Sequence, residues 1–179
     1  MKLFLQLAIA CVLIIHARAA DGWEKVKWGM TMEQVREIYP EAMPSKGTSA
    51  EGGDRMIEGL LISPSMTLEI PRYDWEGLSF QVALIFLGEK GLSGCFMLAP
   101  HDYKNMNLDL RPQYQKVVKS LSETYGEAKE QDVPDTLFRK AEWTSGGTRI
   151  RSMLMLAKEP QLRTAISLTY TKPEAFKKP

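Results

Sequence analysis

Residues 25–42 read KVKWGMTMEQVREIYPEA, and this stretch decides how the first half of the chain folds. Thr31 is a favourable helix N-cap, and Gln34, three residues later, can reach back to it and complete a capping box. Val35 opens an apolar stripe at helical spacing, and Pro40 ends the helix. The stretch lacks the further glycines and the lysine of a phosphate-binding loop. It therefore predicts the start of a helix and not a catalytic loop.

A second helix is predicted in residues 111–128, which read RPQYQKVVKSLSETYGEA. Its apolar residues recur at helical spacing, at Tyr114, Val117, Val118, Leu121 and Tyr125. Pro112 suits the first turn of a helix, and Gly126 suits the position just after the last turn. We expect the helix to run from about Gln113 to Tyr125.

Strand patterns follow each predicted helix in a similar order. After the first helix they cover residues 56–62, 66–73, 78–87 and 92–98, and after the second they cover 137–143, 148–156 and 162–170. Both helices also end alike, in Tyr-Pro-Glu-Ala at 39–42 and Tyr-Gly-Glu-Ala at 125–128. The sequence therefore predicts an α+β fold of two helix-then-β-meander (αβββ) units, residues 21–98 and 99–179, which can form one shared domain. We expect one antiparallel sheet with the helices packed on one face.

The first 20 residues, MKLFLQLAIACVLIIHARAA, have the pattern of a secretory signal peptide. A basic residue, Lys2, precedes an apolar run that is shorter than the roughly 20 residues of a membrane-spanning helix. Small residues then predict cleavage near Ala19 or Ala20. We expect a periplasmic or secreted protein with no transmembrane segment in its mature chain. In an alternative reading, Cys11 carries a lipid.

Composition after this cleavage excludes several classes of protein. Loss of Lys2 and Arg18 reduces the 23 basic residues to 21, against 22 acidic ones, and this balance argues against nucleic-acid binding. Only Cys95 remains as a cysteine, so no intramolecular disulfide can form. One Cys and one His supply no recognisable zinc site, and we expect neither a metal nor a cofactor.

The segment WGMTMEQVREIYPEA, residues 28–42, resembles the opening of small bacterial envelope modules. These are the barrel-assembly lipoproteins of the SmpA/OmlA type and the β-lactamase-inhibitor-like modules, in which a GMT-x-x-x-V helix start precedes an antiparallel sheet. The order of elements matches loosely as far as residue 98. The resemblance implies an exported, non-enzymatic protein whose sheet face binds another envelope or secreted protein.

A candidate partner-binding face is predicted in the second half of the chain. Arginines alternate there with buried aliphatic residues, and two methionines point to the same side as the arginines. The predicted set is Arg149, Arg151, Met153, Met155 and Arg163. Interleaved arginine and apolar side chains are a typical interface composition. Alternatively, this is a solvated face whose charge Glu142 balances.

Two small constellations leave a hydrolase open as an alternative. Cys95 and His101 lie six residues apart and could form a nucleophile-base dyad. Asp74 and Glu76 could act as a carboxylate pair on a sugar. The simpler interpretation makes Cys95 a buried small hydrophobe, and the two acids turn residues beside Trp75.

The leading interpretation is an exported non-enzymatic module for protein binding or envelope assembly. Besides a hydrolase, the alternative is a small-ligand binder whose aromatic pocket combines Trp28, Trp75 and Trp143. A deep pocket would favour chemistry or ligand binding, and a broad exposed sheet face would favour a protein partner.

Overall fold

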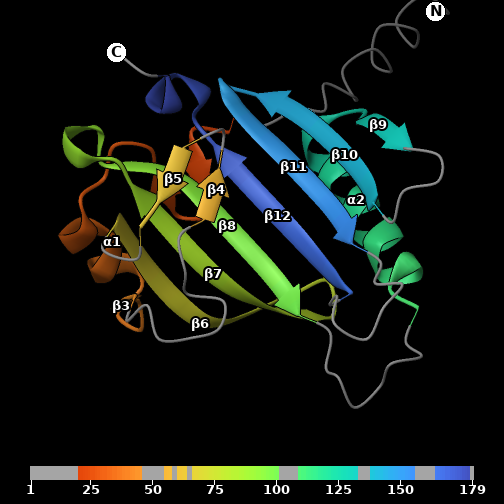
Figure 1. Ribbon diagram of the computed structural model, residues 1–179, viewed down its shortest axis with the longest axis horizontal. Helices are drawn as coiled ribbons and strands as arrows, with labels where there is room; N and C mark the ends of the chain where they lie inside the picture. Colours follow the sequence, from red (N-terminus) through yellow and green to blue (C-terminus); the bar gives the residue numbers. More distant parts are fainter. Residues whose placement is uncertain are drawn as a thin grey trace, which may run out of the picture.

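A computed structural model describes residues 20–45, 55–57, 60–63, 66–100, 109–132, 138–155 and 164–177. These residues form an eight-stranded antiparallel sheet (Figure 1). In spatial order its strands are β3 (Met43–Pro44), β6 (Thr67–Trp75), β7 (Leu78–Phe86), β8 (Leu92–Pro100), β12 (Ala165–Thr171), β11 (Thr148–Met155), β10 (Phe138–Ser145) and β9 (Lys129–Asp132). The α+β class and the antiparallel sheet are thus confirmed.

Helix α1 (Met32–Ile38) begins as its sequence predicts. The Thr31 hydroxyl accepts a hydrogen bond from the Gln34 backbone at 3.3 Å, and the Gln34 side chain accepts one from the Thr31 backbone at 2.9 Å. Val35 is fully buried, and the helix ends before Pro40. The capping box is therefore confirmed in both directions.

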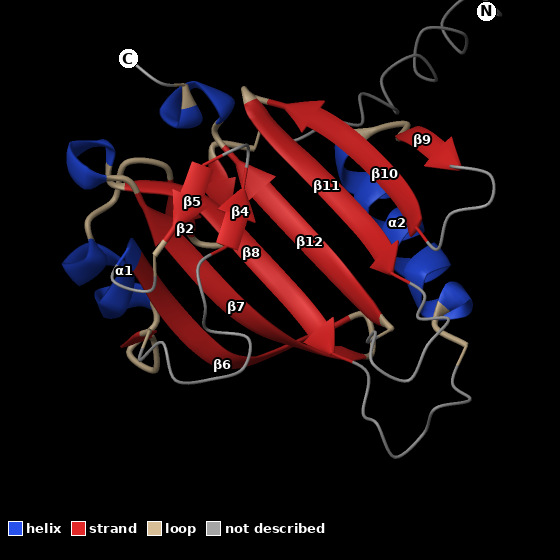
Figure 2. Ribbon diagram, viewed as in Figure 1, coloured by secondary structure: helices blue, strands red, loops and turns tan. Residues whose placement is uncertain are grey.

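Helix α2 (Arg111–Tyr125) begins two residues before the predicted start and ends where predicted. It buries Tyr114, Val117 and Leu121, and it lies against β10 and β11 behind the sheet (Figure 2). Pro112 lies in its first turn, and Gly126 follows the last turn at φ +90°. The helical spacing therefore identified the buried face correctly.

The predicted strands differ from the observed ones at three places. Residues 56–62 do not form one strand, because the chain reverses between β4 (Arg55–Ile57) and β5 (Leu60–Ile62), which pair as a hairpin outside the main sheet. The edge strands β3 and β9 were not predicted, because neither has an alternating apolar pattern. Residues 137, 156 and 162–163 of the predicted strands lie outside the described part of the chain.

Two tight hairpins have the same turn geometry. Glu76 and Gly77 join β6 to β7 at φ +51° and +74°, and Gly146 and Gly147 join β10 to β11 at φ +56° and +79°. Positive φ at both central residues defines a type I′ turn, whose twist matches that of the flanking strands. Glu76 is therefore a turn residue that adopts a conformation usually taken by glycine or asparagine.

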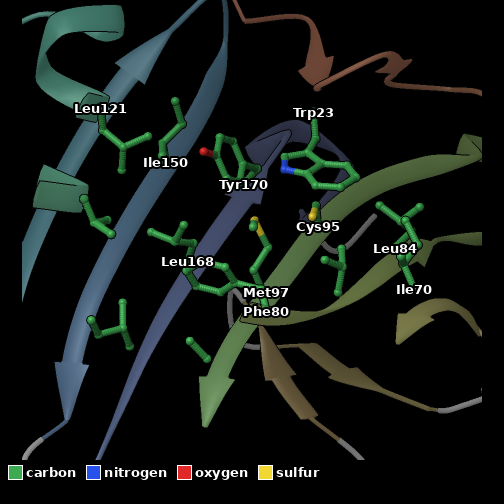
Figure 3. Packing of buried hydrophobic residues seen from close by; sticks show 14 of the residues in the cluster. Trp23, Ile70, Phe80, Leu84, Cys95, Met97, Leu121, Ile150, Leu168 and Tyr170 are labelled. Atoms are coloured by element: carbon green, nitrogen blue, oxygen red, sulfur yellow. The ribbon is translucent and has the colours of Figure 1, made fainter. Parts of the chain in front are cut away.

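The main hydrophobic core lies on the sheet face that α2 covers (Figure 3). It joins Val35 of α1, Val117 and Leu121 of α2, and Trp23 of the short hairpin β1 (Gly22–Trp23)–β2 (Val26–Lys27). From the sheet it takes Leu68, Ile70, Phe80, Val82, Leu84, Cys95, Met97, Ala141, Trp143, Ile150, Leu154, Ile166, Leu168 and Tyr170. Both helices thus contribute to one core.

A smaller cluster lies on the opposite face of the sheet. It contains Ile62 of β5, Ile85 of β7, and Ala175 and Phe176 of the 3₁₀ helix η4 (Pro173–Phe176). Because successive side chains of a strand point to opposite faces, Ile85 and its neighbour Leu84 belong to different clusters. The β4–β5 hairpin and η4 therefore pack on part of the face that α2 leaves open.

Candidate functional site

The candidate site is the part of the open sheet face formed by β10 and β11, called here the outer face. Along β11 four residues that point toward α2 are buried and alternate with four that are half-buried. The half-buried residues are Arg149, Arg151, Met153 and Met155. The structure thus brings four of the five predicted residues to one face, and Arg163 lies outside the described residues.

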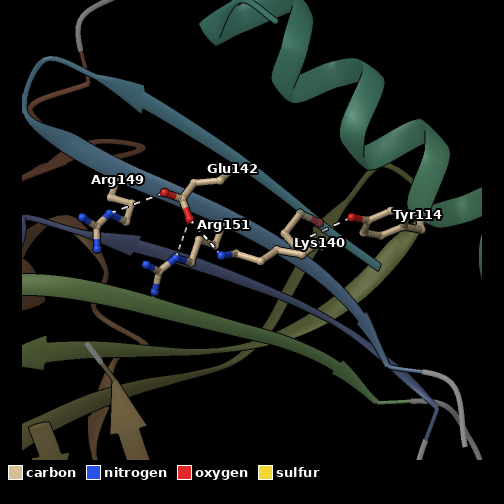
Figure 4. A network of polar contacts seen from close by, with 6 residues as sticks. Tyr114, Lys140, Glu142, Arg149 and Arg151 are labelled. Atoms are coloured by element: carbon tan, nitrogen blue, oxygen red, sulfur yellow. Dashed lines mark hydrogen bonds and ion pairs between the residues drawn. The ribbon is translucent and has the colours of Figure 1, made fainter. Parts of the chain in front are cut away.

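Glu142 of β10 is the centre of this face (Figure 4). Its carboxylate lies 2.9 Å from Arg151 Nε, 3.1 Å from Lys140 Nζ and 3.7 Å from Arg149 Nε. The side chain of Glu142 is 26% exposed, so solvent screens these contacts less than it would at an open surface. Burial raises the pKa of this carboxyl, but hydrogen bonds from Arg151 and Lys140 outweigh that effect and hold the pKa below its ordinary value.

Residues that pair across β10, β11, β12 and β8 form rows, and these rows extend the outer face toward the middle of the sheet. One row contains Glu142, Arg151, Thr169 and Phe96, and the next contains Lys140, Met153, Ser167 and Leu98. Phe96 and Leu98 are half-buried, and Phe96 also packs against the smaller cluster that contains Ile62 and Phe176. A charged cluster therefore lies beside a band of partly accessible apolar side chains.

Sequence reasoning found the arginines and methionines but missed Lys140 and the β8 residues. The signal for Lys140 was present, because Lys140 and Glu142 alternate with the buried Ala141 and, further along, Trp143. The contribution of Phe96 and Leu98 depends on β8 pairing with β12, which lies about 70 residues further along the chain. No local pattern predicts that pairing.

The proposed Cys95–His101 dyad has one described member. Cys95 is fully buried in the main core, and this burial raises the pKa of its thiol well above the ordinary value. A nucleophilic cysteine needs a lowered pKa and access to substrate. His101 lies outside the described residues. The environment of Cys95 is that of a core side chain.

The Asp74–Glu76 pair lies at the tip of the β6–β7 hairpin. Asp74 accepts hydrogen bonds from Arg72 and Ser79, and these hold the pKa of its carboxyl below the ordinary value. A general acid at neutral pH needs the opposite shift. Glu76 occupies the turn itself. These environments match the interpretation of both acids as turn residues.

The three tryptophans predicted to share a pocket lie in separate surroundings. Trp143 donates from Nε1 to the Gly126 carbonyl at 3.1 Å, and Trp28 donates to the Thr148 hydroxyl at 2.7 Å. Trp75 packs near Phe80, with ring centroids 6.2 Å apart. Of the three, Trp75 alone lines the cavity of about 430 Å³ on the helix side of the sheet. This cavity therefore contains one of the three tryptophans of the predicted pocket.

The described part of the chain contains no group of three or more His, Cys, Asp or Glu side chains placed to hold a metal ion. None of the helices described is long and apolar enough to cross a membrane.

Comparison of the chain with protein-family models, with curated proteins and with solved structures finds no match. The resemblance of residues 28–42 to envelope modules therefore stays a prediction.

Proposed function

We propose that this protein is an exported, non-enzymatic module that binds a protein partner through its outer face, as in envelope assembly. One observation carries the proposal: arginines and methionines alternate with core residues along β11, and a shared carboxylate holds the cationic groups in place. Arginine and methionine are enriched in protein interfaces. In this proposal residues 1–20 direct export and are removed near Ala19 or Ala20.

The same proposal includes an origin of the fold in two related units. In the first unit the β1–β2 hairpin precedes α1, and the β4–β5 hairpin lies outside the main sheet. Each unit otherwise has a helix followed by strands that fill one half of the sheet, with β8 of the first unit pairing with β12 of the second. The equivalent type I′ turns and the shared Tyr-x-Glu-Ala helix ends support this repeat. Both helices contribute to one core, and the β4–β5 hairpin and η4 cover part of the opposite sheet face, so the proposed partner binds the β10–β11 part of that face.

The chemistry of the outer face suits a protein surface. Glu142 restricts the side chains of Arg149 and Arg151 before a partner arrives, which lowers the entropy cost of binding. Met153 and Met155 have flexible, polarisable side chains that adapt to an apolar partner surface. The deep burial of Cys95 and the lowered pKa of Asp74 support the absence of hydrolytic catalysis.

Charge reversal on the outer face tests the proposal. We expect Arg151→Glu with Met153→Asp to reduce partner recovery from an envelope extract at least about tenfold, because it removes a cation and an apolar contact together. The matched control is Gln115→Asp with Lys116→Glu, which makes the same change of charge on the exposed side of α2. Equal recovery by the two variants would contradict the proposal.

Site-specific crosslinking supplies a second measurement that does not depend on weakened binding. A photoreactive amino acid at Met153 should form an adduct with a specific protein in intact cells, and the same group at Gln115 should not.

Cell fractionation and mass spectrometry of the mature N-terminus test the export step. A full-length cytoplasmic chain would contradict that step alone.

A further inference from the structure

The cavity of about 430 Å³ lies on the sheet face opposite the outer face. The β1–β2 hairpin lines one side of it, Tyr125 of α2 lines another, and Tyr73 and Trp75 of β6 line a third. Tyr170 of β12 lines it from the sheet. This volume is within the range of small-molecule sites, about 300–1,000 Å³.

The aromatic lining is held in place by packing around Trp23. This residue is 3% exposed, and its ring centroid lies 5.1 Å from that of Tyr73, in an edge-on arrangement with 63° between the planes. On another side it lies 5.8 Å from Tyr39. Edge-to-face pairs at this spacing are favourable contacts. The lining is therefore pre-formed.

Glu24 supplies a negative charge at this aromatic cluster. It lies in the turn of the β1–β2 hairpin at φ +51°, a conformation that is uncommon for a residue other than glycine. Its carboxylate accepts a hydrogen bond from the Tyr73 hydroxyl. Burial raises the pKa of Tyr39 and Tyr170, and the nearby Glu24 charge raises each pKa further. Glu24 therefore lies beside Tyr73 in the lining of the cavity.

Three other charged residues line the cavity: Asp21, Lys25 and Lys27. Lys27 Nζ lies 3.7 Å from Asp21 Oδ2, and both side chains are largely exposed, so these two charges offset each other at the rim. Glu24 and Lys25 are both exposed to solvent. Lys25 contacts the aromatic cluster through its backbone, which is hydrogen-bonded to Tyr39, whereas Glu24 contacts the cluster through its charged carboxylate.

We propose that this cavity binds a small organic ammonium ion, with Glu24 as its counter-ion and Trp75, Tyr73 and Tyr125 as its aromatic wall. The negative faces of aromatic rings attract cations, and a carboxylate beside them adds direct charge complementarity. The proposal adds a ligand site to the proposed function, and because the two sites lie on opposite faces, each can fail alone.

Choline and its neutral isostere 3,3-dimethyl-1-butanol test the proposal, since they differ in charge and hardly in shape. The purified protein is titrated with each by calorimetry and by tryptophan fluorescence, at constant ionic strength. We expect choline to bind saturably and at least about tenfold more tightly than the neutral alcohol. Absence of choline binding, or equal affinity for both, would overturn the proposal.

Two variants assign the binding to the cavity. Glu24→Gln should weaken choline binding about tenfold, and Trp75→Leu should weaken it independently by removing an aromatic wall. Glu37→Gln, an exposed acid on α1 away from the cavity, should leave it unchanged. Circular dichroism checks that each variant is folded. If folded Glu24→Gln or Trp75→Leu bound choline with the affinity of the wild type, choline would bind outside this cavity and the proposal would be wrong.

Discussion

Glu142 arranges three cationic side chains that would otherwise repel one another on neighbouring strands. The two arginines and Lys140 each approach the same carboxylate, and all four side chains are between 26% and 32% exposed. Exposed ion pairs contribute at most about 1 kcal/mol each, and partial burial places this cluster toward the upper part of that range. The main consequence is positional, because one residue sets the charge pattern of the outer face.

The lowered pKa of Glu142 predicts an acid-dependent loss of stability. A carboxyl whose pKa is lower in the folded state contributes stability above the unfolded-state value, 4.5, and loses it as pH falls through the folded-state pKa. We expect the free energy of unfolding in urea to fall between pH 6 and pH 3 in both proteins. The fall should be smaller in Glu142→Gln than in the wild type. An equal difference in both proteins would contradict this.

At the scale of elements, a close approach of two glycines joins the start of α1 to the turn between β7 and β8. Gly29 donates its backbone N–H to the Leu92 carbonyl at 2.8 Å, and Leu92 donates to the Met30 carbonyl at 2.8 Å. A Cβ atom on Gly91 would lie 2.4 Å from the Gly29 carbonyl oxygen. Both glycines have positive φ, so the glycine of the GMT motif serves backbone geometry.

Replacing Gly91 should therefore lower the free energy of unfolding more than replacing a glycine that has positive φ but no close backbone neighbour. In Gly147→Ala the added methyl group meets open space at φ +79°, so the expected loss is the conformational cost, about 1–2 kcal/mol. Gly91→Ala adds a backbone clash at φ +62° and should lose at least about 1 kcal/mol more. Urea unfolding measures both, and equal losses would show that the close approach costs nothing.

The edges of the sheet disfavour strand addition as a binding mode. β3 pairs with β6 at Leu68 and Glu69, and further along β6 come Pro71, Arg72 and an irregularity between Ile70 and Tyr73. β9 at the other edge reads Lys-Glu-Gln-Asp. Proline, charge and bulges are the features that block edge-to-edge pairing. A partner is therefore expected on the sheet face.

At the scale of the whole molecule, one core spans both halves of the chain. Leu84 of β7 and Leu168 of β12 are fully buried in the same cluster, and the central pairing of β8 with β12 joins the halves. Buried side chains of each half pack against those of the other in this core. The structure therefore favours a single folding unit over two independent domains.

Cooperative unfolding is the expected consequence. We expect one transition, with tryptophan fluorescence and far-ultraviolet circular dichroism coinciding, because all the buried apolar surface of the main core is lost together. Leu84→Ala and Leu168→Ala should each lower the free energy of unfolding by about 2–5 kcal/mol. Two separated transitions, each shifted by one of these variants, would show that the halves fold independently.

Features that depend on a few neighbouring residues were predictable. The capping box of Thr31 and Gln34 was correct, and so was the end of α2 at Gly126, because capping atoms lie within one turn of each other. Alternation located β7 and β11 because the side chains of a strand point to its two faces in turn. It failed for the predicted strand 56–62, because β4 and β5 pair with each other as two antiparallel strands.

The sequence by itself determined where α1 starts, where both helices end, which side of β11 is buried, and that arginines and methionines share the other side. Only the tertiary structure decided that Phe96 extends the outer face, and that Trp23 and Glu24, not Trp28 and Trp143, belong to the cavity. The physical reason is distance along the chain. Periodicity and capping act over a few residues, whereas strand register and core packing join segments that no local pattern connects.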